Sequence, residues 1–295
     1  MIIAVSGANG SIGKELTPFL ESLGHTILKI SSSNVGGIKH TFSYIDLKDN
    51  RIPYNVDLFI HLASINADLT EDQIKDEVQI TEDILFSLPY LECSNLIFFS
   101  TCKVYGDNSF DFNIFDESSP LNPICSYGKA KQLCENLIFS QSSLGKFNSL
   151  ILRLPPFLNK SKSSNVGKLI NLSKTRIPIP SIAQGNNNQR SFICFDNIKI
   201  VLAHIIENIN IIENNEVYNL SDEGLISLND LLRIAGAKRV YSLPNFFGKF
   251  LISLPVIKNT IVKLYGNFAL DNSKLKAEMK IKLKTTSELL PIIIK

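Results

Sequence analysis

The chain has 295 residues, of which 44% are hydrophobic and 20% are charged, and its formal net charge is +2. This composition predicts a globular protein with a sizeable core, built as one large domain or two, and argues against a disordered chain. Acidic and basic residues are scattered without long runs, so nothing indicates an electrostatic site for nucleic acid or anionic lipid.

A buried strand, a glycine-rich turn and a helix begin the chain. The apolar run "MIIAVS" is followed at once by "GANGSIG" and then by a helical pattern that Gly24 ends. Gly7, Gly10 and Gly13 lie where the backbone must approach a pyrophosphate and where the first amides of a helix face the anion. The sequence therefore predicts a dinucleotide site, and the early glycine turn argues against a signal peptide.

Strands and helices alternate through the first half of the chain. Further strands are predicted at residues 25–31, 56–64, 95–100 and 149–155, with helices at residues 68–88 and 126–142. Such alternation across short turns implies a parallel sheet with helices on both faces. We expect an α/β fold with a doubly wound parallel sheet, a Rossmann-type NAD(P)-binding domain over residues 1–155.

After Pro155 the pattern becomes mixed. It comprises a polar loop "AQGNNNQRS", a helix at 196–208, a helix opened by Ser227 and Asn229, and a helical tail. We expect a smaller mixed α/β substrate-binding lobe over residues 156–295, with residues 190–208 packing back on the first domain.

The apolar region and the cysteines indicate a cytoplasmic protein. Residues 246–266 are interrupted by lysines and a proline and fall short of the roughly 20 apolar residues of a membrane span. We expect a surface helix pair or a substrate lid there, and no integral membrane segment. The five cysteines are odd in number and lack the paired spacing of a zinc site, which indicates reduced thiols and no bound metal.

The end of the second strand, "ILKISSSN", bears on the choice of cofactor. At this distance from the glycines, an acidic residue binds the ribose hydroxyls of NAD and repels a 2′-phosphate. Ser31, Ser32 and Ser33 offer hydroxyls but no carboxylate, and Lys39 is the candidate cation nearby. NADP(H) is therefore the preferred cofactor, with NAD(H) as the alternative.

The stretch "SYGKAK" places two lysines after Tyr127. On a helix, a residue four positions later lies on nearly the same face, whereas a residue two positions later lies on almost the opposite face. Lys131 can therefore lie beside the phenol, and Lys129 cannot. An adjacent ammonium would lower the pKa of Tyr127 from about 10, which suits a proton donor or acceptor. Tyr44 and Lys48 have the same spacing but flank the end of a predicted strand, where side chains four apart are not turned together, and we interpret them as structural.

The glycine turn, "HLAS", "STCKVYG" and "YGKAK" together resemble the extended short-chain dehydrogenase/reductase family of nucleotide-sugar enzymes, the NAD-dependent epimerase/dehydratase family. The likeness covers most of the chain. It implies that Thr101 hydrogen-bonds the reacting oxygen and that Tyr127 donates or removes a proton. It also implies that Lys131 binds the nicotinamide ribose and lowers the pKa of the tyrosine. The alternative for Thr101 is a strand-end hydroxyl that satisfies its own backbone.

The resemblance implies a set of binding residues. Those expected to contact the dinucleotide are Gly7, Asn9, Gly10, Ser11, Ile12, Gly13, Ser31, Ser32, Asp46, Leu47, Leu62, Ala63, Ser64, Ser100, Tyr127, Lys131 and Pro155. Among these, Asp46 and Leu47 match the pair that contacts adenine. Those expected to contact the substrate are Thr101, Lys103, Tyr127, Asn188, Arg190 and Ser191. His61 is expected to orient the loop beside the cofactor and not to act as a base.

The segment "NNNQRSFICFDNI" is similar to a stretch of the family that lies over the sugar nucleotide. A guanidinium suits a diphosphate because its planar fork makes two charge-assisted bonds, so Arg190 is the candidate, with Asn188 and Ser191 near sugar or ribose oxygens. The alternative is a surface arginine in a polar loop. "PIPSIAQGNNNQRS" and "LYGNFALDNSKLKAEM" further resemble the subgroup that reduces nucleotide-linked 4-keto-6-deoxy-N-acetylhexosamines in surface polysaccharide synthesis.

The residues after Thr101 bear on the reaction. Dehydratases of the family carry Asp-Glu there as an additional acid and base, but this chain has Cys102 and Lys103, so dehydration is disfavoured. The resemblance favours NADPH-dependent reduction of a 4-keto sugar linked to UDP. A C4 epimerase that retains NAD needs almost the same residues. A non-catalytic NADP(H) sensor or scaffold would need the glycines but not the threonine, tyrosine and lysine.

The resemblance also implies a homodimer. The helices at 68–88 and 126–142 match those that pair across a two-fold axis in the family. Their outer positions are expected to include Ile84, Leu133, Leu137 and Ile138, which are apolar enough for a symmetric interface.

Overall fold

The computed structural model describes residues 1–32, 39–66, 68–159, 171, 179–182, 188–212, 216–236, 240–243, 262 and 266–294. It divides into two compact units. Unit 1 comprises Met1–Val104, Leu121–Arg153 and Val201–Tyr218, and unit 2 comprises Tyr105–Pro120, Leu154–Ile200 and Asn219–Lys295. The chain passes from unit 1 to unit 2 between Arg153 and Leu154, and residues 105–120 also belong to unit 2.

A seven-stranded sheet forms the centre of unit 1, in the order β3-β2-β1-β4-β5-β7-β12. Its strands are β1 (Ile2–Ser6), β2 (Thr26–Ser31), β3 (Thr41–Ser43), β4 (Leu58–His61), β5 (Asn95–Thr101), β7 (Asn148–Leu154) and β12 (Glu216–Asn219). Strand β1 runs parallel to both neighbours, with Ile3 opposite Ile27 and Leu58. The pairs β2–β3 and β4–β5 are parallel as well. The predicted doubly wound, Rossmann-type sheet is therefore confirmed.

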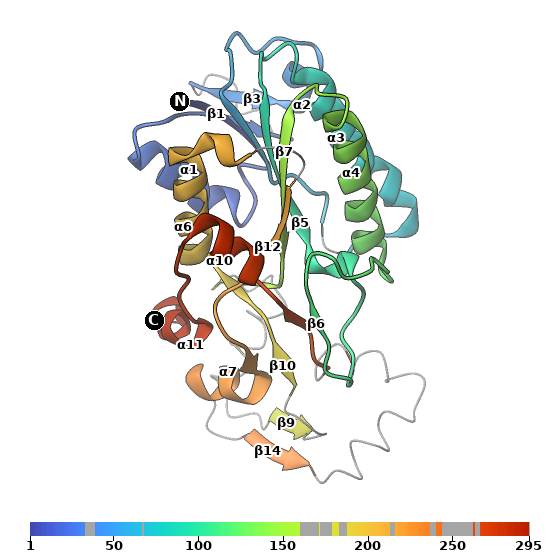
Figure 1. Cartoon of the computed structure of the whole chain (residues 1–295), viewed down its shortest axis with the longest axis vertical. Coiled ribbons are helices and arrows are strands. Elements are labelled where there is room, and N and C mark those ends of the chain that lie inside the picture. The colour runs from blue at the N-terminus through green and yellow to red at the C-terminus, as the bar shows by residue number, and fades with distance from the viewer. Residues whose placement is uncertain are drawn as a thin grey trace. The chain divides into compact units, whose positions relative to one another are not determined.

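Helices cover both faces of this sheet (Figure 1). Helices α3 (Ile74–Ser87) and α4 (Ser126–Ser142) lie side by side on one face. Helix α1 (Gly13–Ser22) and the second half of α6 (Phe195–Glu207) lie on the other. The core under α3 and α4 includes Phe59 and Phe98 of the sheet with Ile84 and Ile138 of the helices. The prediction that Ile84 and Ile138 face outward is therefore wrong, because both are fully buried.

Two local predictions need correction. The helix expected from residue 68 begins with a 3-10 turn at Glu71–Gln73 and becomes α-helical at Ile74, because a capping box between Thr70 and Gln73 sets the start. Residues Tyr44–Lys48, expected at the end of a strand, form the short helix α2, since Ser43 and Asp46 make a second capping box.

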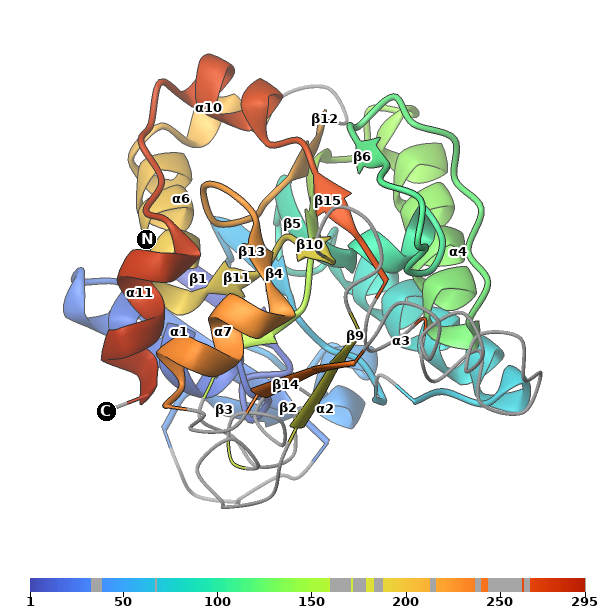
Figure 2. The same ribbon diagram turned by 90° about the horizontal axis from the view of Figure 1, so that it is seen from below.

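Unit 2 is mixed, as predicted, and consists of short elements. The strand pairs are β6 (Ile114–Phe115) with β15 (Ala269–Leu270), β8 (Phe157–Leu158) with β11 (Ile193–Cys194), β9 (Ile179–Ile182) with β14 (Val240–Leu243), and β10 (Gln189–Arg190) with β13 (Ile226–Ser227). Its helices α7 (Leu228–Ile234) and α11 (Thr286–Ile294) pack together around a second core, with α10 (Ser273–Met279) preceding α11 (Figure 2).

Of the apolar region at 246–266, all but residues 262 and 266 lies outside the described residues. None of the helices in the described part of the chain is long and apolar enough to cross a membrane.

Candidate active site

The site lies where the strand order of the sheet reverses. Strands β2 and β3 lie on one side of β1 and the later strands on the other, so the loops after β1 and β4 diverge at the switch point where parallel sheets bind ligands. Gly7 follows β1 with a φ of +71°, and a Cβ added there would lie 2.8 Å from the amide nitrogen of Ala63. Glycine is therefore required for these two loops to touch.

The glycine turn presents its outer residues to solvent. The Gly10 amide donates to the Gly7 carbonyl at 2.9 Å, and α1 begins at Gly13. Asn9, Gly10 and Ser11 are exposed, and Ile12 is half-buried. The side-chain amide of Asn9 donates to the Ser31 hydroxyl at 3.0 Å. These bonds join the turn to the end of β2.

The residues expected to bind the ribose hydroxyls or the 2′-phosphate of the cofactor lie on either side of a segment outside the described residues. Ser31 is buried, whereas Ser32 and Lys39 are exposed, and Ser33 lies outside the described residues.

The loop after β4 offers a hydroxyl to a ligand. Ser64 Oγ is buried and has no hydrogen-bond partner within the described structure, beside Ala63, whose amide lies against Gly7. Leu62 is half-buried. A buried hydroxyl without a partner is costly unless something else bonds to it. The glycine turn and this hydroxyl therefore fit a dinucleotide cofactor.

Helix α2 lies beside the same turn. Asp46, expected to contact adenine, accepts bonds from the amide and hydroxyl of Ser43 at 2.8 and 2.7 Å, and Leu47 is buried in the core. The Tyr44 hydroxyl hydrogen-bonds with the backbone of Gly7 and the side chain of Ser6, and burial raises the pKa of Tyr44 to about 12. Lys48, four residues after Tyr44, is exposed.

Tyr127 lies on the first turn of α4, close to the end of β5. A Cβ added at Gly128 would lie 2.5 Å from the Lys103 carbonyl oxygen, so only glycine lets α4 approach the short 3-10 turn at Cys102–Val104. Thr101, the last residue of β5, precedes that turn and is buried. Its hydroxyl accepts a weak bond of 3.3 Å from the Lys103 amide. The local bond anticipated as the alternative for Thr101 is present, and it leaves the hydroxyl able to donate.

The two lysines of α4 have opposite surroundings. Lys131 is buried, with Nζ 5.9 Å from the Tyr127 ring centroid and 4.8 Å from that of Phe98. The Lys129 side chain is 43% exposed and pairs with Glu71 at 2.8 Å. The helical spacing therefore identifies Lys131 as the partner of Tyr127.

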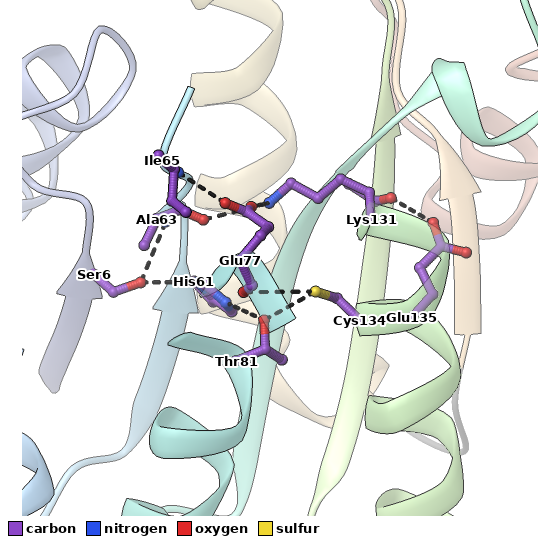
Figure 3. Close-up of polar contacts among 10 residues, drawn as sticks. Ser6, His61, Ala63, Ile65, Glu77, Thr81, Lys131, Cys134 and Glu135 are labelled. Atoms are coloured by element: carbon purple, nitrogen blue, oxygen red, sulfur yellow. Dashed lines mark hydrogen bonds and ion pairs between the residues drawn. The ribbon is translucent and has the colours of Figure 1, made fainter. Parts of the chain in front are cut away.

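A buried carboxylate, which the sequence interpretation missed, completes the site. Glu77 of α3 pairs with Lys131, Oε1 to Nζ 3.0 Å, and both side chains are 2% exposed (Figure 3). Lys131 also donates to the Ala63 carbonyl at 3.3 Å, and Glu77 Oε2 accepts from the Ile65 amide at 2.7 Å. Lys131, expected to bind ribose, is thus bound to protein atoms. Helical periodicity could have found Glu77, since it lies four and seven residues before the buried Thr81 and Ile84.

His61 is held between two hydroxyls. Its Nδ1 is 2.9 Å from Ser6 Oγ and its Nε2 is 3.1 Å from Thr81 Oγ1 (Figure 3). Ser6 Oγ also accepts from the Ala63 amide at 3.4 Å. Burial, with a smaller contribution from Lys131, holds the pKa of His61 well below its usual value, so the ring is neutral at pH 7. This arrangement fits the expectation that His61 orients the loop after β4.

The ionisation of Tyr127 differs from expectation. Burial raises the pKa of Tyr127, Lys131 opposes that rise, and Glu77, Cys102 and Cys125 add to it. The predicted lowering is therefore wrong, because burial outweighs an ammonium that already has a carboxylate partner. Burial alone would lower the pKa of Lys131, but Tyr127 and Glu77 raise it, and the ammonium stays charged.

Ser100, expected at the cofactor, belongs to a second buried network. Its hydroxyl donates to the carboxylate of Glu135, which also pairs with Arg153, Nη2 to Oε2 2.6 Å. These three residues join β5, α4 and β7, and thereby fix the helix that carries Tyr127 and Lys131.

The predicted substrate residues of unit 2 take part in its internal bonding. Arg190 Nε donates to the Gly266 carbonyl at 2.8 Å, and burial lowers the pKa of Arg190 to about 10. Asn188 Oδ1 accepts from the Leu228 amide at 2.8 Å, and Ser191 Oγ accepts from the Leu270 amide at 2.9 Å. Pro155, expected at the cofactor, is buried in unit 2.

All five cysteines are free thiols. Within the described ranges, no cluster of three or more His, Cys, Asp or Glu side chains could hold a metal ion.

Comparison with known proteins identifies the family of this chain. The model of a family described as "NAD dependent epimerase/dehydratase family" matches residues 3–221. UDP-arabinose 4-epimerase 1 of Arabidopsis thaliana is 27% identical over 219 residues, which are 66% of this chain and 49% of that protein. The chain spans about half the length of the curated relatives it matches.

Solved structures share the fold over the whole chain. The UDP-N-acetylglucosamine 4-epimerase of Bacillus cereus matches with a TM-score of 0.77 and 15% identity, covering 100% of this chain and 98% of that one. The dTDP-glucose 4,6-dehydratase of Streptomyces venezuelae, solved with NAD bound, matches with a TM-score of 0.76 and 16% identity, covering 100% and 96%.

Proposed function

The chain belongs to the NAD-dependent epimerase/dehydratase family, and on that premise we propose that it reduces the C4 ketone of a nucleotide-linked 4-keto-6-deoxy (N-acetyl)hexosamine. The observation that carries this proposal is the buried Lys131 beside Tyr127, on a helix held against the turn that follows Thr101. UDP is the proposed nucleotide, and surface polysaccharide synthesis the proposed setting.

The residues of this chain divide the chemistry among them. When bound, a nicotinamide dinucleotide supplies the hydride that reduces C4. Tyr127 donates the proton to the ketone oxygen, and the Thr101 hydroxyl donates a hydrogen bond to the same oxygen. Lys131 stabilises the phenolate that Tyr127 leaves behind. Cys102 and Lys103 after Thr101 supply no acidic pair, which supports reduction over dehydration.

The proposed cofactor is NADPH. Ser31 and Ser32 at the end of β2 carry no charge that would repel a 2′-phosphate, and the exposed Lys39 follows them. NAD(H) is the alternative, in line with the family description and with the NAD-bound structural neighbour.

A C4 epimerase is the second candidate, because the Arabidopsis thaliana relative is a UDP-arabinose 4-epimerase. Such an enzyme first oxidises C4 and then returns the hydride to the opposite face. Tyr127 must therefore accept a proton before it donates one. The two candidates thus differ in the form of Tyr127 that starts the reaction.

One experiment separates the candidates. The protein is incubated with a UDP-linked 4-keto-6-deoxy-N-acetylhexosamine and with NADPH that carries deuterium at both positions of the nicotinamide C4, and the product is analysed by mass spectrometry and NMR. Reduction predicts one deuterium at C4 of the sugar for each NADPH consumed. An epimerase instead interconverts the corresponding 4-hydroxy sugars without net consumption of nucleotide, and that outcome would overturn the reductase proposal.

The proposed assembly is a homodimer formed through α3 and α4. With Ile84 and Ile138 buried, the apolar contribution comes from Leu133, which is 47% exposed, and the half-buried Leu137. A dimer mass in light scattering at micromolar concentration is the expected result, and a monomer mass would contradict it.

A further inference from the structure

Glu77 is a charged group inside the site that the reaction as described does not use. Its carboxylate is 3.0 Å from the Lys131 ammonium and 2.7 Å from the Ile65 amide nitrogen, with the side chain 2% exposed (Figure 3). A charge this deeply buried is retained only when it is paired and hydrogen-bonded. Both conditions are met by groups that belong to the site.

This pairing changes what Lys131 can do for Tyr127. A lone ammonium beside a phenol favours the phenolate, and a carboxylate in contact with that ammonium offsets part of this effect on the phenol. Lys131 lies 5.9 Å from the Tyr127 ring centroid and 3.0 Å from the Glu77 carboxylate. The carboxylate is therefore in direct contact with the ammonium, which also lies near the phenol ring.

Building on the proposed reductase activity, we propose that Glu77 is a positioning residue whose carboxylate partly offsets Lys131 and so favours the protonated form of Tyr127, which reduction consumes. Glu77 also holds the loop after β4, through the Ile65 amide, while Lys131 bonds to the Ala63 carbonyl of that loop. The same contacts disfavour the first step of an epimerase, because oxidation of the C4 hydroxyl must begin with Tyr127 as the phenolate.

The groups that act on Tyr127 support this assignment. They are Lys131, Glu77, Cys102 and Cys125. After burial, which raises the pKa of Tyr127 most, Lys131 lowers it, and Glu77 and the two thiols raise it. Glu77 is the one carboxylate among these groups in the described structure, so it is the natural target for substitution.

The test is the ionisation of Tyr127 in the isolated protein. Glu77→Gln removes the charge but keeps the shape and an acceptor for the Ile65 amide, and Glu77→Asp keeps the charge. Phenolate absorbance is titrated for each, and the same variants carrying Tyr127→Phe are subtracted to remove the other tyrosines. We expect Tyr127 in Glu77→Gln to titrate about one pH unit lower, the shift that one nearby charge commonly causes, and Glu77→Asp to match the parent.

The outcomes distinguish this inference from the proposed reaction. An unchanged Tyr127 titration in Glu77→Gln would overturn the role of Glu77, whatever the substrate proves to be. Absence of NADPH-dependent reduction in the parent would overturn only the reaction. If Glu77→Gln does not fold, Lys131→Met is compared with Lys131→Met/Glu77→Gln. Tyr127 should titrate lower in the double variant, and equal titrations would refute the proposal.

Discussion

Arg153→Met is expected to destabilise the protein strongly, because it leaves a buried carboxylate without its cationic partner. Glu135 accepts from Arg153 Nε at 3.1 Å and from Nη2 at 2.6 Å, and also from the Ser100 hydroxyl. The side chains of Arg153 and Glu135 are 4% and 1% exposed. Methionine approximates the length of the arginine stem but leaves the carboxylate without its cation.

The magnitude follows from this geometry. Removing one partner of a buried ion pair costs about 3 to 5 kcal/mol, because the remaining charge is neither solvated nor paired. Replacing both partners, as in Arg153→Met/Glu135→Gln, should cost much less, since no buried charge remains. Lys129→Met serves as the control, because it removes a pair with Glu71 in which both side chains are exposed, and should leave the free energy of unfolding almost unchanged.

Urea unfolding followed by circular dichroism measures these differences. Arg153→Met should be the least stable of the three variants, and the double variant should recover most of the loss. A single variant within about 1 kcal/mol of the parent would show that the network between β5, α4 and β7 does not hold the helix in place.

Three further predictions concern the cofactor, the substrate and pH. NADPH should bind more tightly than NADH, and Ser31→Asp should reverse the order by repelling the phosphate; an NADH preference in the parent, seen by nucleotide fluorescence, would refute this. Arg190→Ala should weaken substrate binding by about 1.5 to 3 kcal/mol without changing NADPH affinity, and unchanged substrate affinity in calorimetry would return Arg190 to a structural role. Burial raises the pKa of Tyr127 above its ordinary 10.0, so the reduction rate should stay constant through neutral pH and fall only at higher pH; a fall near pH 8 would contradict it.

Much of the fold could be predicted because its signals are local. The strand "MIIAVS", the glycine turn and Gly24 mark β1 and α1, and the helix at 126–142 was predicted with the bounds that the structure has. The short helix α2 was missed because its start depends on a capping box between Ser43 and Asp46, two polar residues that resemble a turn in the sequence. The outward placement of Ile84 and Ile138 failed because only the sheet beneath them decides which face is buried.

The candidate site was predicted in part, for a similar reason. Helical spacing is enough to separate Lys131 from Lys129, because both lie on the same element as Tyr127. Glu77 belongs to a different helix, and its contact with Lys131 arises only when α3 packs beside α4. The ionisation of Tyr127 was predicted with the wrong sign, since neither its burial nor this carboxylate is visible in the spacing.

In the proposed reaction, Tyr127 donates the proton, and Lys131, not Lys129, supports it. The most direct measurement is kcat for Tyr127→Phe, Lys131→Met and Lys129→Met in one NADPH-dependent reductase assay. We expect a loss of at least about a hundredfold for Tyr127→Phe, the low end for general acid catalysis, a strong loss for Lys131→Met and little change for Lys129→Met. Near-normal turnover of Tyr127→Phe, or equal and mild effects of the two lysine substitutions, would contradict it.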